Sequence, residues 1–73
     1  MKTVWVVGTR NDYYSENEIY IFEKEYDAKK FFEKIIEENK DENEFAYEEG
    51  DGNATWGYKG YYCSASVWQQ ELR

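Results

Sequence analysis

The stretch Glu18–Glu38, EIYIFEKEYDAKKFFEKIIEE, decides the fold because the spacing of its apolar residues changes part of the way along. Residues 18–23 are rich in β-branched and aromatic side chains, which is typical of a strand. The isoleucines of this segment share one strand face and its aromatic residues share the other. From residue 28 the apolar positions follow the i, i+3, i+4, i+7, i+8 pattern of one helix face, with Ala28, Phe31, Phe32, Ile35 and Ile36. The stretch therefore predicts a strand followed by an amphipathic helix.

The predicted helix has an identifiable beginning and end. Asp27 is a good N-cap residue, and Tyr26 and Phe31 have the spacing of a hydrophobic staple around it. Asn39 and Lys40 suit the end, because a cation is favourable near a helix C-terminus. We therefore expect the helix to start just after Asp27 and to end near Lys40.

Strands are predicted on both sides of this unit. Thr3–Val7 is apolar on both faces, which indicates either a central strand covered on both sides or a strand with one face on a partner. The polar segment 8–18 reads as a loop that joins it to an antiparallel neighbour. Further strands are predicted at 45–47, 54–58 and 61–70, with a strong turn signal at 49–53. In the last of these strands, Cys63 and its alternate neighbours read as core.

These elements predict one α+β domain spanning residues 1–73, with a single helix packed on a small antiparallel sheet. The expected order is β-β-α-β-β, and the last strand is either continuous or split in two by a bend or bulge at Lys59-Gly60.

Charge is concentrated in one segment of the chain. The formal net charge is −7, and residues 41–51 contain six acidic side chains and no Lys or Arg. The predicted acidic contact residues are Asp41, Glu42, Glu44, Glu48, Glu49 and Asp51. Glu42 and Glu44 would project to the same side of a strand, and Glu48 would join them if that strand were continuous. The block is either a solvated face that aids solubility or a phosphate-like surface offered to a basic groove.

Aromatic residues are more numerous than one small core requires. The set left over comprises Tyr13, Tyr14, Trp56, Tyr58, Tyr62 and Trp68. Tyr and Trp are enriched at binding hot spots, so this set predicts a partner-binding patch or a dimer interface. The plainer alternative is that these side chains only cover a small sheet.

Composition makes several chemistries improbable. The chain has no histidine, which removes the commonest general base and metal ligand. Cys63 has no cationic neighbour in sequence and is expected to be a buried structural thiol, so we predict no catalytic residue, metal or cofactor. The acidic balance disfavours direct binding to nucleic acid or to an anionic membrane. The single cysteine and the short apolar run near the N-terminus indicate a cytoplasmic protein without a targeting segment.

Residues 3–38 resemble a class of short phage and prophage proteins through the strand Val4–Val7, the strand Ile19–Phe22 and the helix from Asp27. Members of this class begin with a strand of the "VYVV" type, continue with a strand ending in Phe, and then form a Lys/Glu-rich helix. The class includes small acidic inhibitors of host defences, such as anti-CRISPR proteins. The resemblance implies a phage-encoded inhibitor in a bacterial cytoplasm and assigns no role to an individual residue.

The leading hypothesis from the sequence is a non-catalytic protein-binding module that inhibits a nucleic-acid-handling complex by acting as a DNA mimic. Its expected partner is a protein with a basic surface. The first alternative is a self-associating structural or accessory protein that forms a homodimer. The second alternative is a small-ligand binder with an aromatic pocket.

Overall fold

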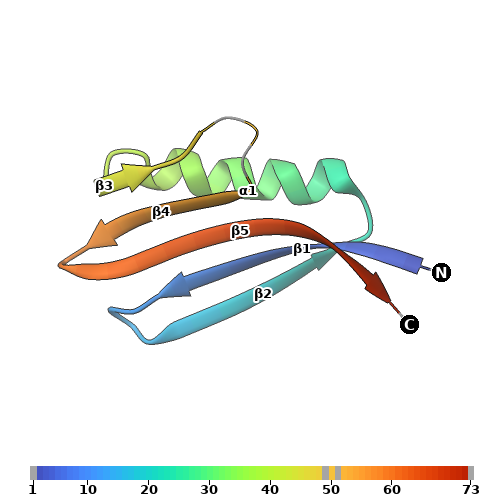
Figure 1. Ribbon diagram of the computed structural model, residues 1–73, viewed down its shortest axis with the longest axis horizontal. Coiled ribbons are helices and arrows are strands. Elements are labelled where there is room, and N and C mark those ends of the chain that lie inside the picture. The colour runs from blue at the N-terminus through green and yellow to red at the C-terminus, as the bar shows by residue number, and fades with distance from the viewer. Residues whose placement is uncertain (1, 49, 51, 73) are drawn as a thin grey trace.

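The computed structural model describes residues 2–48, 50 and 52–72. Its elements in chain order are β1 (Lys2–Asn11), β2 (Glu16–Phe22), α1 (Glu25–Asn39), β3 (Asn43–Ala46), β4 (Asn53–Tyr58) and β5 (Tyr61–Leu72). Within the described residues, a single helix packs on one five-stranded sheet, which confirms the predicted α+β class (Figure 1). Lys59 and Gly60 both have positive φ and form a tight turn between β4 and β5. The last predicted strand is therefore split in two at Lys59-Gly60, which was one of the two alternatives.

The sheet has the strand order β2-β1-β5-β4-β3, and every neighbouring pair is antiparallel. β1 lies between β2 and β5 and is therefore a central strand, but α1 covers only one of its two faces. The loop predicted at residues 8–18 is wrong in extent, because pairing continues as far as Asn11↔Glu16 and leaves only a four-residue turn. In that turn the Asn11 side chain accepts hydrogen bonds from two backbone N–H groups, which stabilises the tight connection.

The helix begins earlier than predicted. Its N-cap is Lys24, in extended conformation and without a side-chain capping hydrogen bond to the described residues, so the predicted N-cap at Asp27 is wrong. Asp27 instead lies in the first turn with Glu25, where acidic side chains stabilise the positive end of the helix dipole. Tyr26 is 70% exposed and does not form the expected staple. The predicted end is confirmed, since Lys40 is the C-cap.

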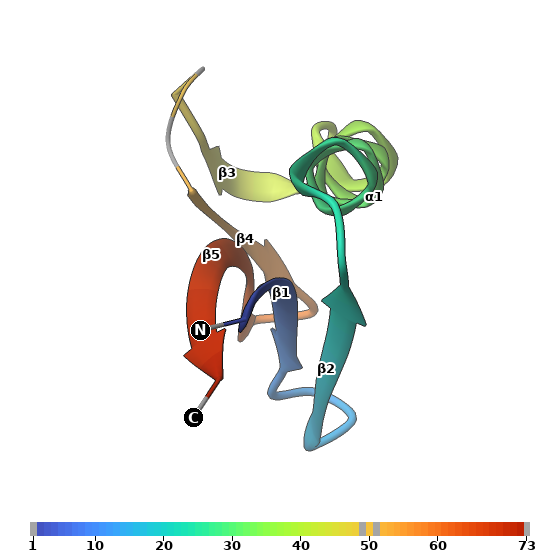
Figure 2. The same cartoon turned by 90° about the vertical axis from the view of Figure 1, so that its right-hand side faces the viewer.

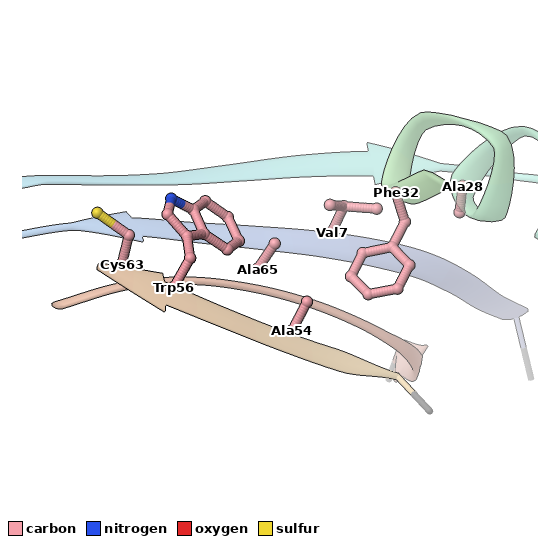
Figure 3. Packing of buried hydrophobic residues seen from close by; sticks show 7 residues of the cluster. All are labelled: Val7, Ala28, Phe32, Ala54, Trp56, Cys63 and Ala65. Carbon is pink, nitrogen blue, oxygen red and sulfur yellow. The ribbon is translucent and has the colours of Figure 1, made fainter. Parts of the chain in front are cut away.

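The core lies between α1 and one face of the sheet (Figures 2 and 3). Ala28 and Phe32 are the buried residues of the predicted helix stripe, and Phe31, Ile35 and Ile36 pack against the cluster as partly buried residues. From the sheet, Cys63 and Ala65 are fully buried, as the alternation in the last strand predicted. Trp56 of β4 pairs with Cys63 of β5. The small side chains of Cys63 and Ala65 leave room for the indole in the core (Figure 3).

The helix is shorter than the strands that it covers. Its 15 residues span about 22 Å, whereas the 12 residues of β5 span about 40 Å. The β4–β5 turn therefore extends past the C-terminal end of α1 (Figure 1). Beyond Asn39 the helix-side face of the sheet is open, and this opening determines where a site is available.

Candidate functional site

The opening beyond the C-terminus of α1 contains a cavity of about 340 Å³. Its wall includes three carboxylates and three aromatic rings, and we refer to it as the acidic pocket. These six residues are Glu16, Glu18, Glu42, Tyr14, Trp56 and Tyr58. Ile35 and Asn39 of the last helical turns close one side of it. The acidic pocket therefore combines residues from both sets that the sequence singled out, the acidic block and the unassigned aromatics.

Three structural elements position the carboxylates. Glu16 and Glu18 are alternate residues of β2, opposite Asn11 and Thr9 of β1, and both project to the helix side of the sheet. Glu42 follows the helix in a turn in which its backbone N–H donates to the carbonyl of Asn39 at 3.0 Å. Of the three, Glu42 is half-buried and the other two are exposed. The carboxylates thus approach the pocket from the sheet edge and from the helix end.

The electrostatic character of the acidic pocket is negative. The carbonyl end of a helix carries a partial negative charge, and α1 ends at this pocket. Lys40, the nearest cation in sequence to that end, pairs with Glu37 at 2.6 Å. Glu18 accepts a hydrogen bond from the Tyr20 hydroxyl, which raises the pKa of that tyrosine. The pocket is accordingly arranged to attract a cation.

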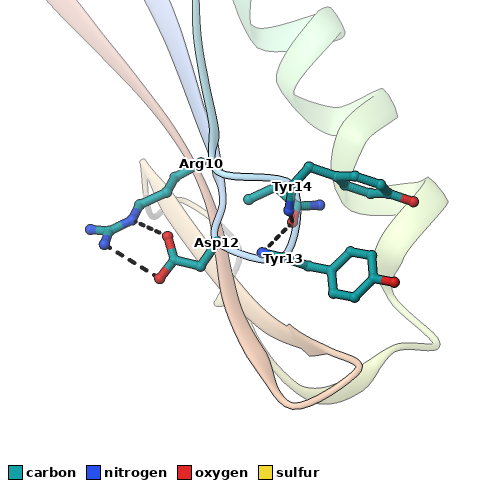
Figure 4. Close-up of polar contacts among 5 residues, drawn as sticks. Arg10, Asp12, Tyr13 and Tyr14 are labelled. Carbon is teal, nitrogen blue, oxygen red and sulfur yellow. Dashed lines mark hydrogen bonds and ion pairs between the residues drawn. The ribbon is translucent and has the colours of Figure 1, made fainter.

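Arg10 also borders the pocket, but its charged group is engaged elsewhere. Its Nε donates to the Asp12 carboxylate at 2.7 Å, and its guanidinium lies 5.7 Å from the centre of the Tyr62 ring. This hydrogen bond is the main cause of the raised pKa of Arg10. Figure 4 shows the pair directed away from the two tyrosines of the β1–β2 turn. Arg10 therefore leaves the carboxylates of the pocket available.

Tyrosine rings form a cluster beside the acidic pocket. The Tyr13 ring lies 4.8 Å from that of Tyr14, 5.3 Å from that of Tyr58 and 5.4 Å from that of Tyr61. A hydrogen bond with Tyr58 is the largest cause of the raised pKa of Tyr14. The ammonium of Lys59 lies 4.9 Å from the centre of the Tyr13 ring and 5.4 Å from that of Tyr58. The ring faces of this cluster thus already hold one cation from the chain itself.

The predicted acidic row does not form as the alternation argument required. β3 ends at Ala46, so Glu48 lies beyond it and the condition of a continuous strand is not met. Glu44 has φ of 58°, within an irregular register between Asn43 and Ala46, which breaks the alternation with Glu42. The Glu44 carboxylate lies over Gly57 of β4 instead. Asp41 is exposed in the turn after the helix.

The remaining predicted contact residues do not form a single surface. Glu49 and Asp51 lie outside the residues that the structure describes. Trp56 borders the pocket but is 9% exposed, so it is a core residue more than a free contact. Tyr62 and Trp68 project from β5 to the sheet face away from α1, because they alternate with the core residues of that strand. Of the aromatic set, Tyr14 and Tyr58 border the pocket directly and Tyr13 lies beside them.

Sequence reasoning missed Glu16 and Glu18 as site residues, because it placed Glu16 in a loop and Glu18 only at the boundary between that loop and a strand. The available signal was their even spacing from Tyr20, since Glu18 lies two residues before it and Glu16 four residues before it. Once β2 is extended back to Glu16, alternation places both carboxylates on the face of the strand that carries Tyr20 and Phe22. The number of carboxylates in the pocket therefore depends on how far the β1–β2 hairpin extends.

The pocket suits an organic cation better than a metal ion. Among residues 2–48, 50 and 52–72, no three acidic or cysteine side chains are close enough together to hold a metal. An ammonium or guanidinium group, in contrast, can contact a carboxylate and an aromatic face at once. A nucleophilic role for Cys63 is disfavoured, since burial raises the pKa of its thiol.

Two general findings complete the description of the chain. In the described ranges, no helix combines the length and the apolar composition that crossing a membrane requires. In comparisons with known proteins, no family model matches the chain, no curated protein is significantly similar to it, and no solved structure matches it.

Proposed function

We propose that this protein is a non-catalytic binding module that captures a lysine or arginine side chain of a basic partner protein in the acidic pocket. The observation that carries the proposal is that Glu16, Glu18 and Glu42 line one pocket together with tyrosine rings at the open end of the core. Carboxylates supply charge and hydrogen-bond acceptors, and ring faces add attraction for the same cation. The tyrosine cluster beside the pocket provides the apolar anchors that a hot spot needs.

The charge of the whole chain supports this type of partner. With a net charge of −7, the protein attracts basic surfaces over long range and accelerates encounter with them. Basic grooves are the surfaces that proteins use to hold nucleic-acid phosphates. The specific form of the proposal is therefore an inhibitor that occupies such a groove in a bacterial nucleic-acid-handling complex. The resemblance to small acidic phage inhibitors agrees with this form, which remains a prediction.

A free organic cation is the second candidate occupant. The cavity of about 340 Å³ is large enough for a small diamine or polyamine, whose ammonium groups have the same chemistry as a lysine side chain. The protein partner is preferred because the tyrosine cluster extends the site onto the exposed surface. Tyr14 is 55% exposed and Tyr61 is 50% exposed.

The test compares two double variants of equal charge. Glu16→Gln with Glu42→Gln removes two pocket carboxylates, and Glu33→Gln with Glu38→Gln removes two exposed helix carboxylates away from the pocket. Each variant is titrated with an arginine-rich peptide and with spermidine at low and at high salt. An exposed ion pair contributes about 0.2–1 kcal/mol, so losing two should weaken peptide binding by roughly 2–30-fold. The helix variant should bind as the original protein does.

The possible results separate the alternatives. Equal weakening in both variants would mean that the peptide responds only to net charge, and the pocket proposal would be rejected. Pocket-dependent binding of spermidine without pocket-dependent binding of the peptide would favour the small-ligand function. A tagged pull-down from bacterial lysate then identifies the partner. The proposal requires a captured protein that is lost at high salt and with the pocket variant, but not with the helix variant.

A further inference from the structure

On the sheet face that points away from α1, the strands β1, β2 and β5 carry no acidic residue, and the carboxylate of Glu44 from β3 lies over Gly57 of β4. We call this the outer face; it is formed by the alternate residues of β1, β2, β4 and β5 that do not face the helix. Among the described residues of β1, β2, β4 and β5, Glu16, Glu18 and Glu71 all alternate to the helix side, and none of the outer-face positions is Asp or Glu. This segregation is unexpected in a chain with 16 acidic residues.

The two cations of the outer face stand near the ends of β1 and are paired. Lys2 lies 3.6 Å from the Glu23 carboxylate, and Arg10 pairs with Asp12. Both acidic partners follow the ends of their strands, so the centre of the outer face carries no formal charge. Its polar positions are neutral, as in the hydrogen bond of 2.9 Å from Ser66 to Asn53.

The centre of the outer face is also apolar. Val4 and Val6 are each 5% exposed although they belong to this face and not to the core cluster under α1. Val6 lies between Ile21 of β2 and Trp68 of β5 in the register of the sheet. Ile19 is 61% exposed and Ile21 is 66% exposed, values that are high for large aliphatic side chains. The result is an apolar strip that crosses three strands.

Gly8 leaves room for side chains of β2 and β5 to approach each other across β1. A Cβ at Gly8 would lie 3.0 Å from the six-membered ring of Trp68 and 3.4 Å from Ile19. The missing side chain therefore lets the indole cross β1 and approach the isoleucine of β2. Glycine weakens a strand interior, and close packing by another group is a common reason for its presence. The indole remains 38% exposed, so it presents a ring surface to whatever covers the strip.

We infer that the outer face is the interface between two copies of this chain. Two copies with a charge of −7 repel each other wherever their carboxylates meet. On the outer face the apolar strip across β2, β1 and β5 carries no carboxylate among the described strand residues, and Glu44 lies outside the strip, over β4. A basic partner would gain no carboxylate contact at the strip, and an acidic partner would meet only cations that are already paired. A neutral apolar surface is complementary to an identical surface, as a two-fold contact requires.

The small core and the area of the outer face both favour a second copy of the chain as the partner. Val7 and Cys63 are the largest of its fully buried side chains, so the core under α1 is small and a dimer would add a second buried layer. Four strands about 4.8 Å apart and about 30 Å long present roughly 600 Å² in projection. A standard interface buries about 800 Å² of the more corrugated accessible surface per partner. The two faces would pack as a sandwich and leave both acidic pockets on the outside.

The first experiment measures the mass in solution by sedimentation equilibrium at micromolar to high micromolar concentration. The expected mass is twice the 8.8 kDa of one chain. Ile19→Lys with Ile21→Lys should give the mass of one chain, because ammonium groups would be buried at the centre of the contact. Tyr26→Lys, at an equally exposed apolar residue on the helix, should leave the dimer intact. A single-chain mass for the original protein throughout this range would overturn the inference.

A second variant distinguishes this dimer from one made by pairing of the β2 edges. Ser66→Lys places a charge in the centre of the outer face, two strands away from β2, and should also abolish the dimer. If Ser66→Lys dimerises while the isoleucine variant does not, the copies meet edge to edge and the sandwich is wrong. Glu16→Gln with Glu42→Gln should keep the dimer mass, because these carboxylates line the acidic pocket and not the outer face. The dimer test therefore does not depend on whether the proposed pocket function is correct. Circular dichroism of each variant verifies that it is folded.

Discussion

Neutralising Glu42 should make the free protein more stable, although the same change should weaken its binding. Glu42 follows the last turn of α1, and its carboxylate borders the pocket with Ile35 and Asn39. A negative charge at this end of a helix opposes the partial charge of its free carbonyl groups. Glu16 and Glu18 add like charges to the same pocket. A locally unfavourable charge is typical of a binding site, where stability and function compete.

The expected size of the effect follows from the position of Glu42 at the helix end. A charge in the last turn contributes about 0.3–1 kcal/mol at low ionic strength. A domain of 73 residues has a free energy of unfolding of roughly 4–11 kcal/mol, so this increment is measurable. It corresponds to a rise in Tm of roughly 1–8 °C for a domain of this size. High salt should reduce the rise, since the interaction is near the surface and is screened.

The assay is urea and thermal unfolding of Glu42→Gln, followed by tryptophan fluorescence and circular dichroism. Glu25→Gln is the matched control, because both variants change the net charge from −7 to −6. Glu25 lies in the first turn of α1 and pairs with Lys29 at 3.3 Å, so its neutralisation should lower stability by a similar amount. If both variants shift stability in the same direction, overall charge and not the helix end is responsible, and the reasoning fails.

Two further predictions concern the glycines at the ends of β4 and the buried thiol. Gly52→Ala should lower the free energy of unfolding by about 1–2 kcal/mol, because its Cβ would lie 2.8 Å from the Val67 carbonyl oxygen in a strand paired on both sides. Gly57→Ala should be neutral or stabilising, since its nearest obstacle is the flexible carboxylate of Glu44 at 3.3 Å; equal losses in the two variants would contradict this comparison. Burial raises the pKa of the Cys63 thiol, so the unfolded chain releases this proton first as the pH rises. Stability should therefore be complete below about pH 8.5 and decline above it, and urea unfolding should show a flatter alkaline decline for Cys63→Ala. Identical pH profiles would show that the thiol does not contribute.

The helix and the strand face of β5 were predictable because their signals are local. Ala28 and Phe32 are four residues apart and lie on the same helix face wherever the helix begins. The predicted N-cap was wrong by three residues, but the predicted buried face was still correct. Cys63 and Ala65 are fully buried because alternation in a regular strand admits only two faces. The N-cap was missed because Lys24 gives no capping signal in the sequence, while Asp27 gives a strong one.

Long-range pairing decided the features that were missed. The length of the β1–β2 hairpin depends on hydrogen bonds between strands, and polar residues at its tip resemble a loop when they are read alone. Glu44 lost its predicted alternation because β3 shifts register against β4. Trp56 became a core residue because small side chains on β5 made room for it. None of these facts belongs to a single segment of sequence.

Local spacing in the sequence determined the class of fold, the buried stripe of the helix and the grouping of each strand's residues into two faces. It did not determine which face of β2 would be covered, since alternation defines faces only relative to each other. The docking of α1 decided that Tyr20 and Phe22 lie inside and that Ile19 and Ile21 lie outside. The same docking placed the end of a short helix over a longer sheet and so created the acidic pocket. The physical reason is that burial depends on what packs against a surface, and only the tertiary structure specifies that contact.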